Sequence, residues 1–367
     1  MYISEGLKKK YNQAKSLGRV DKSQRITRFQ SDNMENKERN LFIDYLRILA
    51  CFLVVLYHSR YEIYDWVSEG GSLSFVDHLS LNVSFVIGRL AVPLFFMITG
   101  YLTFPVHGGG AFQFLRKRLP RLCLPLIFWA VAYTLMFSAP TNYITDIITL
   151  KYSPQLWYLY ALLGVTLTLP LISPFFENAS RRETEFYLVI WLLTLIFNGN
   201  NFSFFQVIET THNGMLFTNP ISCLINFYGY VGYILLGFYV KKYSLPNHLP
   251  YILIVLGVVV YVVLRKLCGL PDSGSIAYLS CANMLLSVGF FLVACKLFHT
   301  HTQFLSKLTN LTFGVYLIHW LVFQFLYMLF PISRHINCVL MSLVVFLVSL
   351  LLVKILSFLP FKKYVIG

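Results

Sequence analysis

The stretch Asn40 to Arg60, NLFIDYLRILACFLVVLYHSR, decides the fold, because it is apolar enough to cross a bilayer and yet contains charged side chains. A helix of about 20 apolar residues, rising 1.5 Å per residue, spans the hydrocarbon core. At about 100° per residue, Arg47 and His58 lie within about 20° on one face and about 16 Å apart in depth, and Asp44 shares that face. A central arginine costs about 2.5–3.5 kcal/mol on insertion scales, so this face is predicted to look into the bundle or into a wet cavity.

The composition of the whole chain is that of a polytopic membrane protein. Of its 367 residues, 57% are hydrophobic, 17% are aromatic and only 13% are charged. We therefore expect an all-α bundle of about ten transmembrane helices, at roughly 41–60, 81–104, 119–138, 155–174, 185–198, 220–240, 250–268, 276–297, 311–330 and 336–357. Residues 1–38 lack apolar periodicity and are predicted to be a basic, disordered cytoplasmic tail, followed by one membrane domain over residues 39–360.

The net charge of +14 is explained by topology rather than by nucleic acid. Ten of the 30 Lys and Arg residues fall within residues 1–40. When residues at the span ends are counted with the adjoining loops, 23 of the 30 lie on the side of the tail. Five lie on the other side, namely Arg60, Lys151, Arg265, Lys266 and Arg334, and Arg47 and Arg89 lie within spans. Because cytoplasmic loops carry the excess of Lys and Arg, both termini are predicted to be cytoplasmic, with the tail against anionic membrane lipid.

Three ionisable residues within or beside the first two spans are the candidates for catalysis. His58 is a candidate general base, because imidazole exchanges protons near neutral pH; the alternative is an ordinary histidine at the membrane interface. Arg47 on the same face favours the functional interpretation, although Asp44 at i−3 could simply neutralise it as a structural ion pair. Arg89, in the second span, has no acidic neighbour in its own helix and needs a partner elsewhere or an anionic ligand.

A basic cluster marks the cytoplasmic end of the third span. It consists of Arg116, Lys117, Arg118 and Arg121. Arg118 and Arg121 are one helical turn apart, so they can bind phosphates together. Composition alone favours the simpler interpretation, which is membrane anchoring by positive charge.

Further polar and aromatic side chains are candidates for lining a cavity. They are Asp44, Thr99, Trp157, Tyr158, Tyr316 and His319. Trp157 and Tyr158 are first of all typical of an interfacial aromatic belt. Tyr316 and His319 are one turn apart and are expected to satisfy each other by a hydrogen bond. Pro93 and Gly100 indicate a kink or a close helix contact in the second span. The sequence has no metal-type spacing of Cys and His and no nucleotide-binding loop.

Taken together, these motifs resemble the acyltransferase 3 family of bacterial integral membrane acyltransferases, and especially its compact branch typified by the enterobacterial common antigen O-acetyltransferase. The resemblance rests on IDYLR (43–47) followed by His58, VPLFFMITGY (92–101), RLPR (118–121), LWYLY (156–160) and GVYLIH (314–319). The family usually has serine where Thr99 stands, which keeps a hydroxyl group.

The resemblance implies an enzyme of the bacterial inner membrane that transfers an acyl group, usually acetyl, to a hydroxyl of a cell-surface glycan or its lipid-linked precursor. The donor would be cytoplasmic acetyl-CoA, a co-substrate rather than a bound cofactor. It further implies that His58 and Arg47 are essential and that Arg118 and Arg121 hold the CoA phosphates.

Two other classes of function fit the polar residues. In a secondary transporter or glycan exporter, intramembrane Asp, Arg and His would form a proton path. A non-catalytic subunit would use the same bundle to position glycan enzymes. Solute uptake without acyl-CoA would favour the first, and loss of a partner without loss of acyl transfer would favour the second.

Overall fold

The computed structural model describes most of the membrane domain. The described residues are 41–60, 72–106, 110–138, 142–197, 210–212, 215–217, 227–267, 269, 272–298, 303–329, 337–360 and 362–366. The predicted tail, residues 1–38, lies outside the described residues, and so do residues 220–226 of the predicted sixth span.

The described part of the chain is helical apart from one short antiparallel hairpin, in which Thr210 pairs with Phe217. In chain order the elements are α2 (Leu41–His58), α4 (Phe75–Gly88), α5 (Ala91–Thr103), α6 (Gly110–Phe137), α7 (Tyr143–Ile148), η1 (Pro154–Leu156), α8 (Trp157–Asn178), α9 (Arg181–Phe197), β1 (Thr210–His212), β2 (Met215–Phe217), α10 (Val231–Lys242), α11 (Leu249–Lys266), α12 (Asp272–Ser275), α13 (Cys281–Leu297), α14 (Gln303–Thr309), α15 (Thr312–Leu329), α16 (Cys338–Leu356) and α17 (Lys362–Val365). The all-α expectation therefore holds except for this hairpin.

Seven segments of the described chain are long and apolar enough to cross a membrane. They are Leu41–His58, Phe75–Thr103, Gly110–Phe137, Pro154–Asn178, Leu249–Lys266, Thr312–Leu329 and Cys338–Leu356. The remaining predicted spans correspond to shorter helices: α9 and α13 have 17 residues each and α10 has 12. The structure thus supports a multi-pass membrane protein, while the count of ten and the cytoplasmic termini stay predictions.

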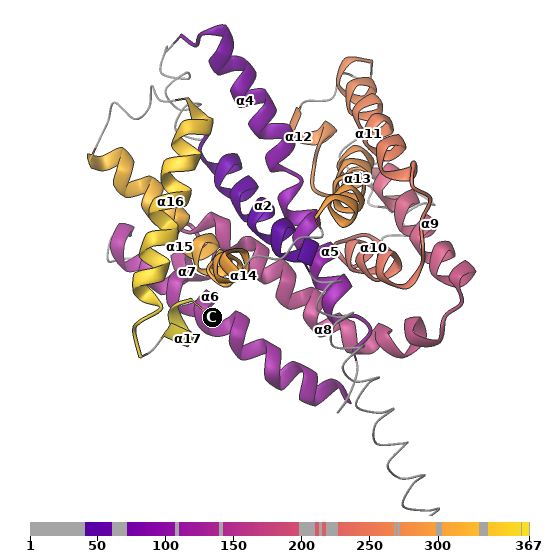
Figure 1. Cartoon of the computed structure of the whole chain (residues 1–367), viewed down its shortest axis with the longest axis horizontal. Helices are drawn as coiled ribbons and strands as arrows, with labels where there is room; N and C mark the ends of the chain where they lie inside the picture. The colour runs from indigo at the N-terminus through magenta and orange to yellow at the C-terminus, as the bar shows by residue number, and fades with distance from the viewer. Residues whose placement is uncertain are drawn as a thin grey trace, which may run out of the picture.

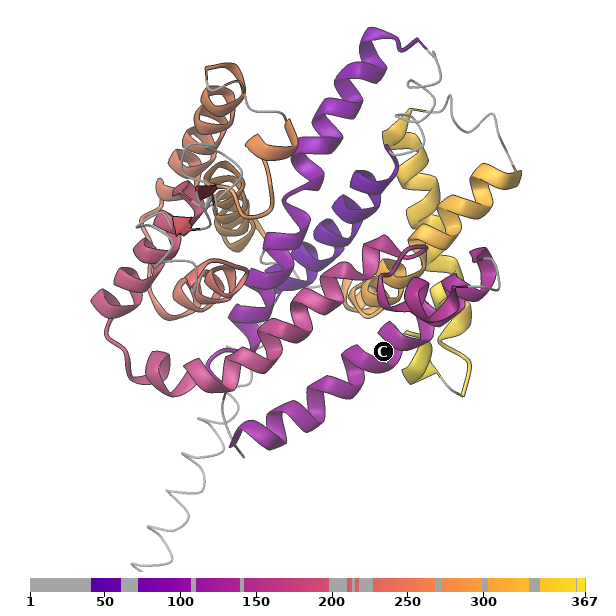
Figure 2. The same cartoon turned by 180° about the vertical axis from the view of Figure 1, so that it is seen from behind.

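Helix α2 lies in the middle of the bundle, with α4 and α5 on one side and α15 and α16 on the other (Figures 1 and 2). Its core face is completely buried at Leu46, Ala50 and Val55. Cys51 is also fully buried, and its Sγ lies 3.3 Å from the Thr312 carbonyl oxygen of α15. The helix that carries Arg47 and His58 is therefore held on several sides, which fixes both side chains relative to the other helices.

The second predicted span is broken, and the break lies upstream of the predicted kink. Helix α4 ends at Gly88 and α5 begins at Ala91. Pro93 has no N–H to donate to the Arg89 carbonyl at i−4, and its ring crowds that oxygen, so the helix opens at Arg89. The freed carbonyl accepts a hydrogen bond from Asn283 Nδ2 of α13 at 3.0 Å. The kink expected from Pro93 is therefore confirmed, but the helix breaks four residues upstream of the proline, at Arg89.

Helix α5 is locked against α10 by backbone contact. A Cβ atom at Gly100 would lie 2.1 Å from the Ile234 carbonyl oxygen, and one at Gly237 would lie 2.0 Å from the Met97 carbonyl oxygen. Only glycine permits this approach, which is common between membrane helices because no larger side chain separates the backbones. The close helix contact expected at Gly100 is confirmed.

Helix α6 is longer than predicted, because it begins at Gly110 rather than near residue 119. Its 28 residues extend about 42 Å at 1.5 Å per residue. The basic cluster therefore lies on the helix itself. Near its other end, Trp129 Nε1 donates to the Val365 carbonyl oxygen at 2.7 Å, so α17 closes the bundle against α6.

Candidate functional site

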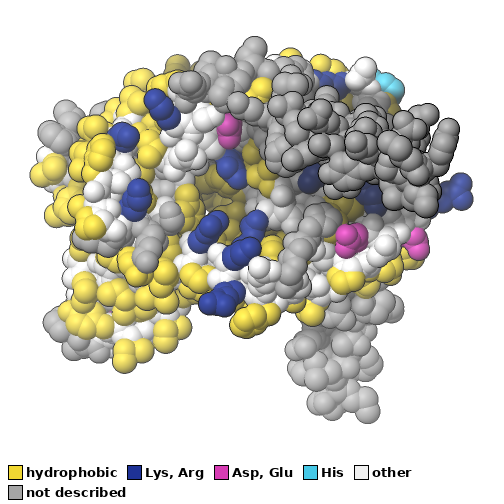
Figure 3. All heavy atoms as spheres, turned by 60° about the horizontal axis from the view of Figure 1, so that its bottom comes forward, with side chains coloured by type: hydrophobic (Ala, Val, Ile, Leu, Met, Phe, Trp, Pro, Cys, Tyr) yellow, Lys and Arg dark blue, Asp and Glu magenta, His cyan; other side chains and the backbone are white. Residues whose placement is uncertain are grey.

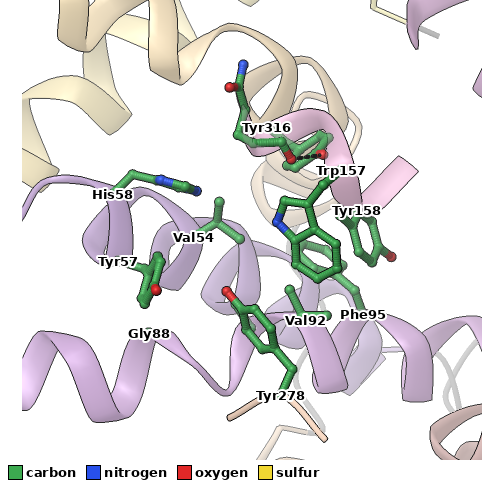
Figure 4. Close-up of a pocket in the computed structure, with 12 residues that line it drawn as sticks. Val54, Tyr57, His58, Gly88, Val92, Phe95, Trp157, Tyr158, Tyr278 and Tyr316 are labelled. Carbon is green, nitrogen blue, oxygen red and sulfur yellow. Dashed lines mark hydrogen bonds between the residues drawn. The ribbon is translucent and has the colours of Figure 1, made fainter. Parts of the chain in front are cut away.

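A narrow cavity of about 20 Å³ lies beside the end of α2 (Figure 4). Its walls come from α2, the α4–α5 break, η1 with α8, α15 and the turn before α13. The lining residues are Val54, Tyr57, His58, Gly88, Ala91, Val92, Phe95, Gln155, Trp157, Tyr158, Tyr278 and Tyr316. Most of the wall is aromatic or aliphatic, with one imidazole and a few phenol groups, which is the usual composition of a small-molecule pocket.

His58 is the one imidazole in the wall of this cavity. It is the last residue of α2 and is partly buried. Its ring points toward Val54 and the space in front of Tyr316 (Figure 4). Behind it, the His319 ring lies 5.2 Å away and the Trp320 ring 5.5 Å away, centroid to centroid. His58 therefore presents a basic nitrogen in a mostly apolar chamber, where a general base acts without competition from bulk water.

Trp157 and Tyr158 lie in the wall of the cavity, as expected of cavity-lining residues rather than of an interfacial aromatic belt alone. The Trp157 ring lies 5.3 Å from the Tyr278 ring. The short helix η1 holds them in place, because the Tyr316 hydroxyl donates to the Gln155 carbonyl oxygen at 2.6 Å. Pro154 at the start of η1 turns the chain into α8, so these two residues face the cavity from its first turn.

Arg89 lies just outside the cavity, at the helix break. Its guanidinium lies 4.8 Å from the Tyr278 ring centroid and 5.1 Å from the Tyr57 ring centroid, and both tyrosines line the cavity. Its buried Nε has no hydrogen-bond partner within the described part of the chain. Next to it, α5 begins without a side-chain cap at Ala91, and its first two residues line the cavity. A cation and the positive end of a helix therefore meet at one wall.

Arg47 lies deeper along α2, and the structural ion pair with Asp44 is not formed. Asp44 accepts a weak hydrogen bond from the Ser306 hydroxyl at 3.5 Å instead. Arg47 interacts electrostatically with Asp44, with Tyr158 and with Arg118. The Tyr158 hydroxyl points away from the cavity (Figure 4). Tyr158 thus stands between the His58 cavity and Arg47.

The basic cluster of α6 lies at the same side as Arg47. Arg116, Lys117 and Arg121 are exposed and Arg118 is half-buried. Arg118 interacts electrostatically with both Arg121 and Arg47. Figure 3 shows basic side chains around a hollow on one face of the molecule. The two arginine motifs, separated by about 70 residues of sequence, are therefore neighbours.

Three of the predicted lining residues, Asp44, Thr99 and His319, do not line the cavity. The Thr99 hydroxyl donates to the Phe95 carbonyl oxygen of its own helix at 2.9 Å. His319 is fully buried behind His58. Nor do Tyr316 and His319 bond to each other as expected, since the Tyr316 hydroxyl is taken by Gln155 and His319 Nδ1 faces the Tyr316 carbonyl oxygen at 2.7 Å.

Sequence reasoning missed Tyr278, Tyr57 and Arg60. Tyr278 falls inside the predicted eighth span, because a hydropathy window does not separate the turn at 276–280 from α13. Arg60 is expected in an outer loop, yet it is buried, and its guanidinium lies 4.3 Å from the Tyr57 ring centroid. Tyr57 could have been found from its place directly before His58 in the sequence, but no sequence pattern indicates Tyr278.

Comparison with known proteins identifies the family. A family model described as an acyltransferase domain, that of acyltransferase 3, matches residues 40–361. The chain belongs to the acyltransferase 3 family. A serine/alanine racemase of Enterococcus gallinarum is 26% identical over 213 residues, which cover 51% of this chain but 28% of the racemase. The chain thus corresponds to little more than a quarter of that relative, and no solved structure matches it.

Family membership agrees with the geometry described above. An acyltransferase of this family works in the membrane, and the seven apolar segments provide the bundle for it. The finer assignment, to the branch of the enterobacterial common antigen O-acetyltransferase, finds no support among these relatives.

Proposed function

We propose that the protein is an O-acyltransferase that moves an acyl group, acetyl in the simplest case, from cytoplasmic acyl-CoA to a hydroxyl of a cell-surface glycan or its lipid-linked precursor. It would work in the bacterial inner membrane. The single observation that supports this most is the pairing of two features: a cavity with His58 in its wall, and the basic cluster of α6 beside Arg47, with Tyr158 between the cavity and Arg47.

The basic cluster of α6 suits the donor. CoA carries several phosphates, and arginine binds phosphate with two parallel hydrogen bonds. Arg118 and Arg121 would hold these phosphates, assisted by Arg116 and Lys117 at the exposed rim. The pantetheine arm would then extend past Arg47 and Tyr158 toward His58, a rise of about 16 Å along α2.

The cavity suits the transfer. His58 would remove the proton of the acceptor hydroxyl, whose oxygen attacks the thioester carbonyl carbon. The C–O bond forms, the C–S bond breaks, and the proton passes from His58 to the sulfur of the leaving CoA. The oxyanion formed in between needs donors at one wall, and stabilisation of such an oxyanion is usually the largest single term in acyl transfer. Arg89 and the uncapped start of α5 are nearer to this point than Arg47, so we assign the oxyanion to them.

Purified protein in proteoliposomes tests the proposal. Acetyl-CoA is added outside, a lipid and glycan extract of the source membranes is included, and CoA release is followed with a thiol reagent. The extract is then analysed for a mass increase of one acetyl group.

Loss of activity is expected for His58→Ala and Arg47→Ala. The exposed His78 and Arg182 offer matched controls, since His78→Ala and Arg182→Ala remove the same groups away from the site. Full acylation by the two site variants would refute the mechanism, and solute uptake without acyl-CoA would favour a transporter.

A further inference from the structure

His319 is a buried histidine that the proposed reaction does not yet use. It lies on α15, none of its surface is exposed, and it does not line the cavity. Its ring centroid is 5.2 Å from that of His58, with the two ring planes inclined at 43°. A group in this position cannot reach a substrate, but it can act on His58.

The backbone fixes the proton of His319. Its Nδ1 lies 2.7 Å from the Tyr316 carbonyl oxygen and 3.2 Å from the Val315 carbonyl oxygen. A carbonyl oxygen only accepts hydrogen bonds, so Nδ1 must carry the proton. In a neutral imidazole the other nitrogen is then an acceptor.

That acceptor is buried and unused. His319 Nε2 is shielded from solvent and has no hydrogen-bond partner among the described residues. An acceptor left alone in the interior costs about 1–3 kcal/mol, so such a group in a native protein needs an explanation. The neighbouring imidazole of His58 is a donor of the right chemistry at the right depth.

We infer that His319 is the positioning residue for His58: its Nε2 accepts a hydrogen bond from the ring N–H of His58 and so leaves the other His58 nitrogen unprotonated toward the cavity. The inference rests on the proposed acyl transfer and deepens it. No proton leaves His319 at any stage. When His58 takes the proton of the acceptor hydroxyl, the same hydrogen bond becomes charge-assisted and stronger.

Arg60 and the phenol groups near His58 do not offer this role. Arg60, two residues after the end of α2, is a cation and has no acceptor. Tyr57, Tyr278 and Tyr316 also face the cavity with phenol groups. The Tyr316 hydroxyl already donates to the Gln155 carbonyl oxygen. Among these neighbours, His319 is the one whose acceptor nitrogen is fixed by its own backbone contacts.

The test compares two substitutions at one position in the full chain. His319→Leu removes the acceptor and keeps much of the volume, whereas His319→Gln can present a carboxamide oxygen near the place of Nε2. Phe323→Leu is the control, because Phe323 packs on His319 at 6.4 Å without a hydrogen bond to it. Each protein is checked for monodispersity, and acetyl-CoA turnover is measured against pH with the membrane extract as acceptor.

His319→Leu is expected to lower kcat about tenfold or more, with an unchanged KM for acetyl-CoA, because general-base catalysis contributes about 10²–10⁴-fold and its orientation is lost. The acid limb of the pH–rate profile is expected to move to lower pH, since the protonated form of His58 loses its hydrogen bond. His319→Gln should recover part of both changes. Equal losses in the two variants with an unmoved profile would overturn the inference.

A second readout separates this inference from the proposed function. The rate at which diethyl pyrocarbonate modifies His58, followed by mass spectrometry against pH, reports the state of that ring without any turnover. If the wild-type protein shows no acyl transfer, the proposed function fails. The pairing then stands if the modification midpoint differs between wild type and His319→Leu, and falls if the midpoints coincide.

Discussion

Replacement of Asn283 by leucine is expected to loosen the helix break that carries Arg89. Asn283 is completely buried on α13. Its Nδ2 donates to the Arg89 carbonyl oxygen at 3.0 Å and to the Ile276 carbonyl oxygen at 3.3 Å, and its Oδ1 accepts from the Ser287 hydroxyl at 2.9 Å. One side chain thus connects the break in the second span to the turn that holds Tyr278.

The magnitude follows from these three hydrogen bonds. Hydrogen bonds between membrane helices average about 0.6 kcal/mol, so losing three costs about 2 kcal/mol. Two buried carbonyl groups are also left without a donor, and each unsatisfied carbonyl costs about 1–3 kcal/mol, which raises the expected loss for Asn283→Leu to about 4–8 kcal/mol. Activity should fall about tenfold, less than the 10²–10³-fold of removing an oxyanion donor, because Arg89 is displaced and not deleted.

The assay is thermal unfolding of the detergent-purified protein together with acetyl-CoA turnover. Ser287→Ala is the control, because it removes one of the three bonds and leaves the contact with Arg89 in place. We expect it to cost about 0.6 kcal/mol and to leave turnover unchanged. If Asn283→Leu is as stable and as active as the wild type, or if Ser287→Ala lowers turnover equally, the explanation of the break is wrong.

Three further predictions concern α5 and α6. Gly100→Ala should sharply reduce the monodisperse fraction in size-exclusion chromatography, because the new Cβ meets the Ile234 carbonyl oxygen, whereas Gly164→Ala, with open space around it, should not. Arg118→Ala should raise the KM for acetyl-CoA about tenfold or more, since a hydrogen bond to a charged group contributes about 1.5–3 kcal/mol; acetyl-pantetheine, which lacks the nucleotide phosphates, should show no such change. Thr99→Val should leave turnover unchanged, because the hydroxyl is bonded within its own helix; a loss of more than a few-fold would return Thr99 to the site.

The sequence was most informative where a residue type contradicted its surroundings. Arg47 and His58 stood out because ionisable side chains are costly in an apolar helix, and the structure puts Arg47 beside the basic cluster of α6 and His58 in the cavity wall. Pro93 indicated a break because proline has no N–H to donate within a helix. The break lies four residues upstream, because the carbonyl that would have accepted this hydrogen bond belongs to Arg89.

Contacts between distant segments were beyond the sequence. No local pattern indicates that His319 lies behind His58, since 261 residues separate them and either could have faced another helix. Likewise, Asp44 and Arg47 looked like an ion pair because they share a face, but the Ser306 hydroxyl of α14 donates to the Asp44 carboxylate instead. The lengths of α9, α10 and α13 also depend on neighbouring helices, because hydropathy alone does not say where a helix ends.

If the proposed function holds, the backbone contact between α5 and α10 limits which acyl groups can be accepted. At Gly100 and Gly237 neither helix can approach the other more closely, so the side of the chamber formed by Val92 and Phe95 is a rigid boundary. A longer chain could gain room only where side chains, rather than main chains, meet, as they do between Trp157 and Tyr278. Chain-length selectivity would then be governed by the rotamers of those two rings.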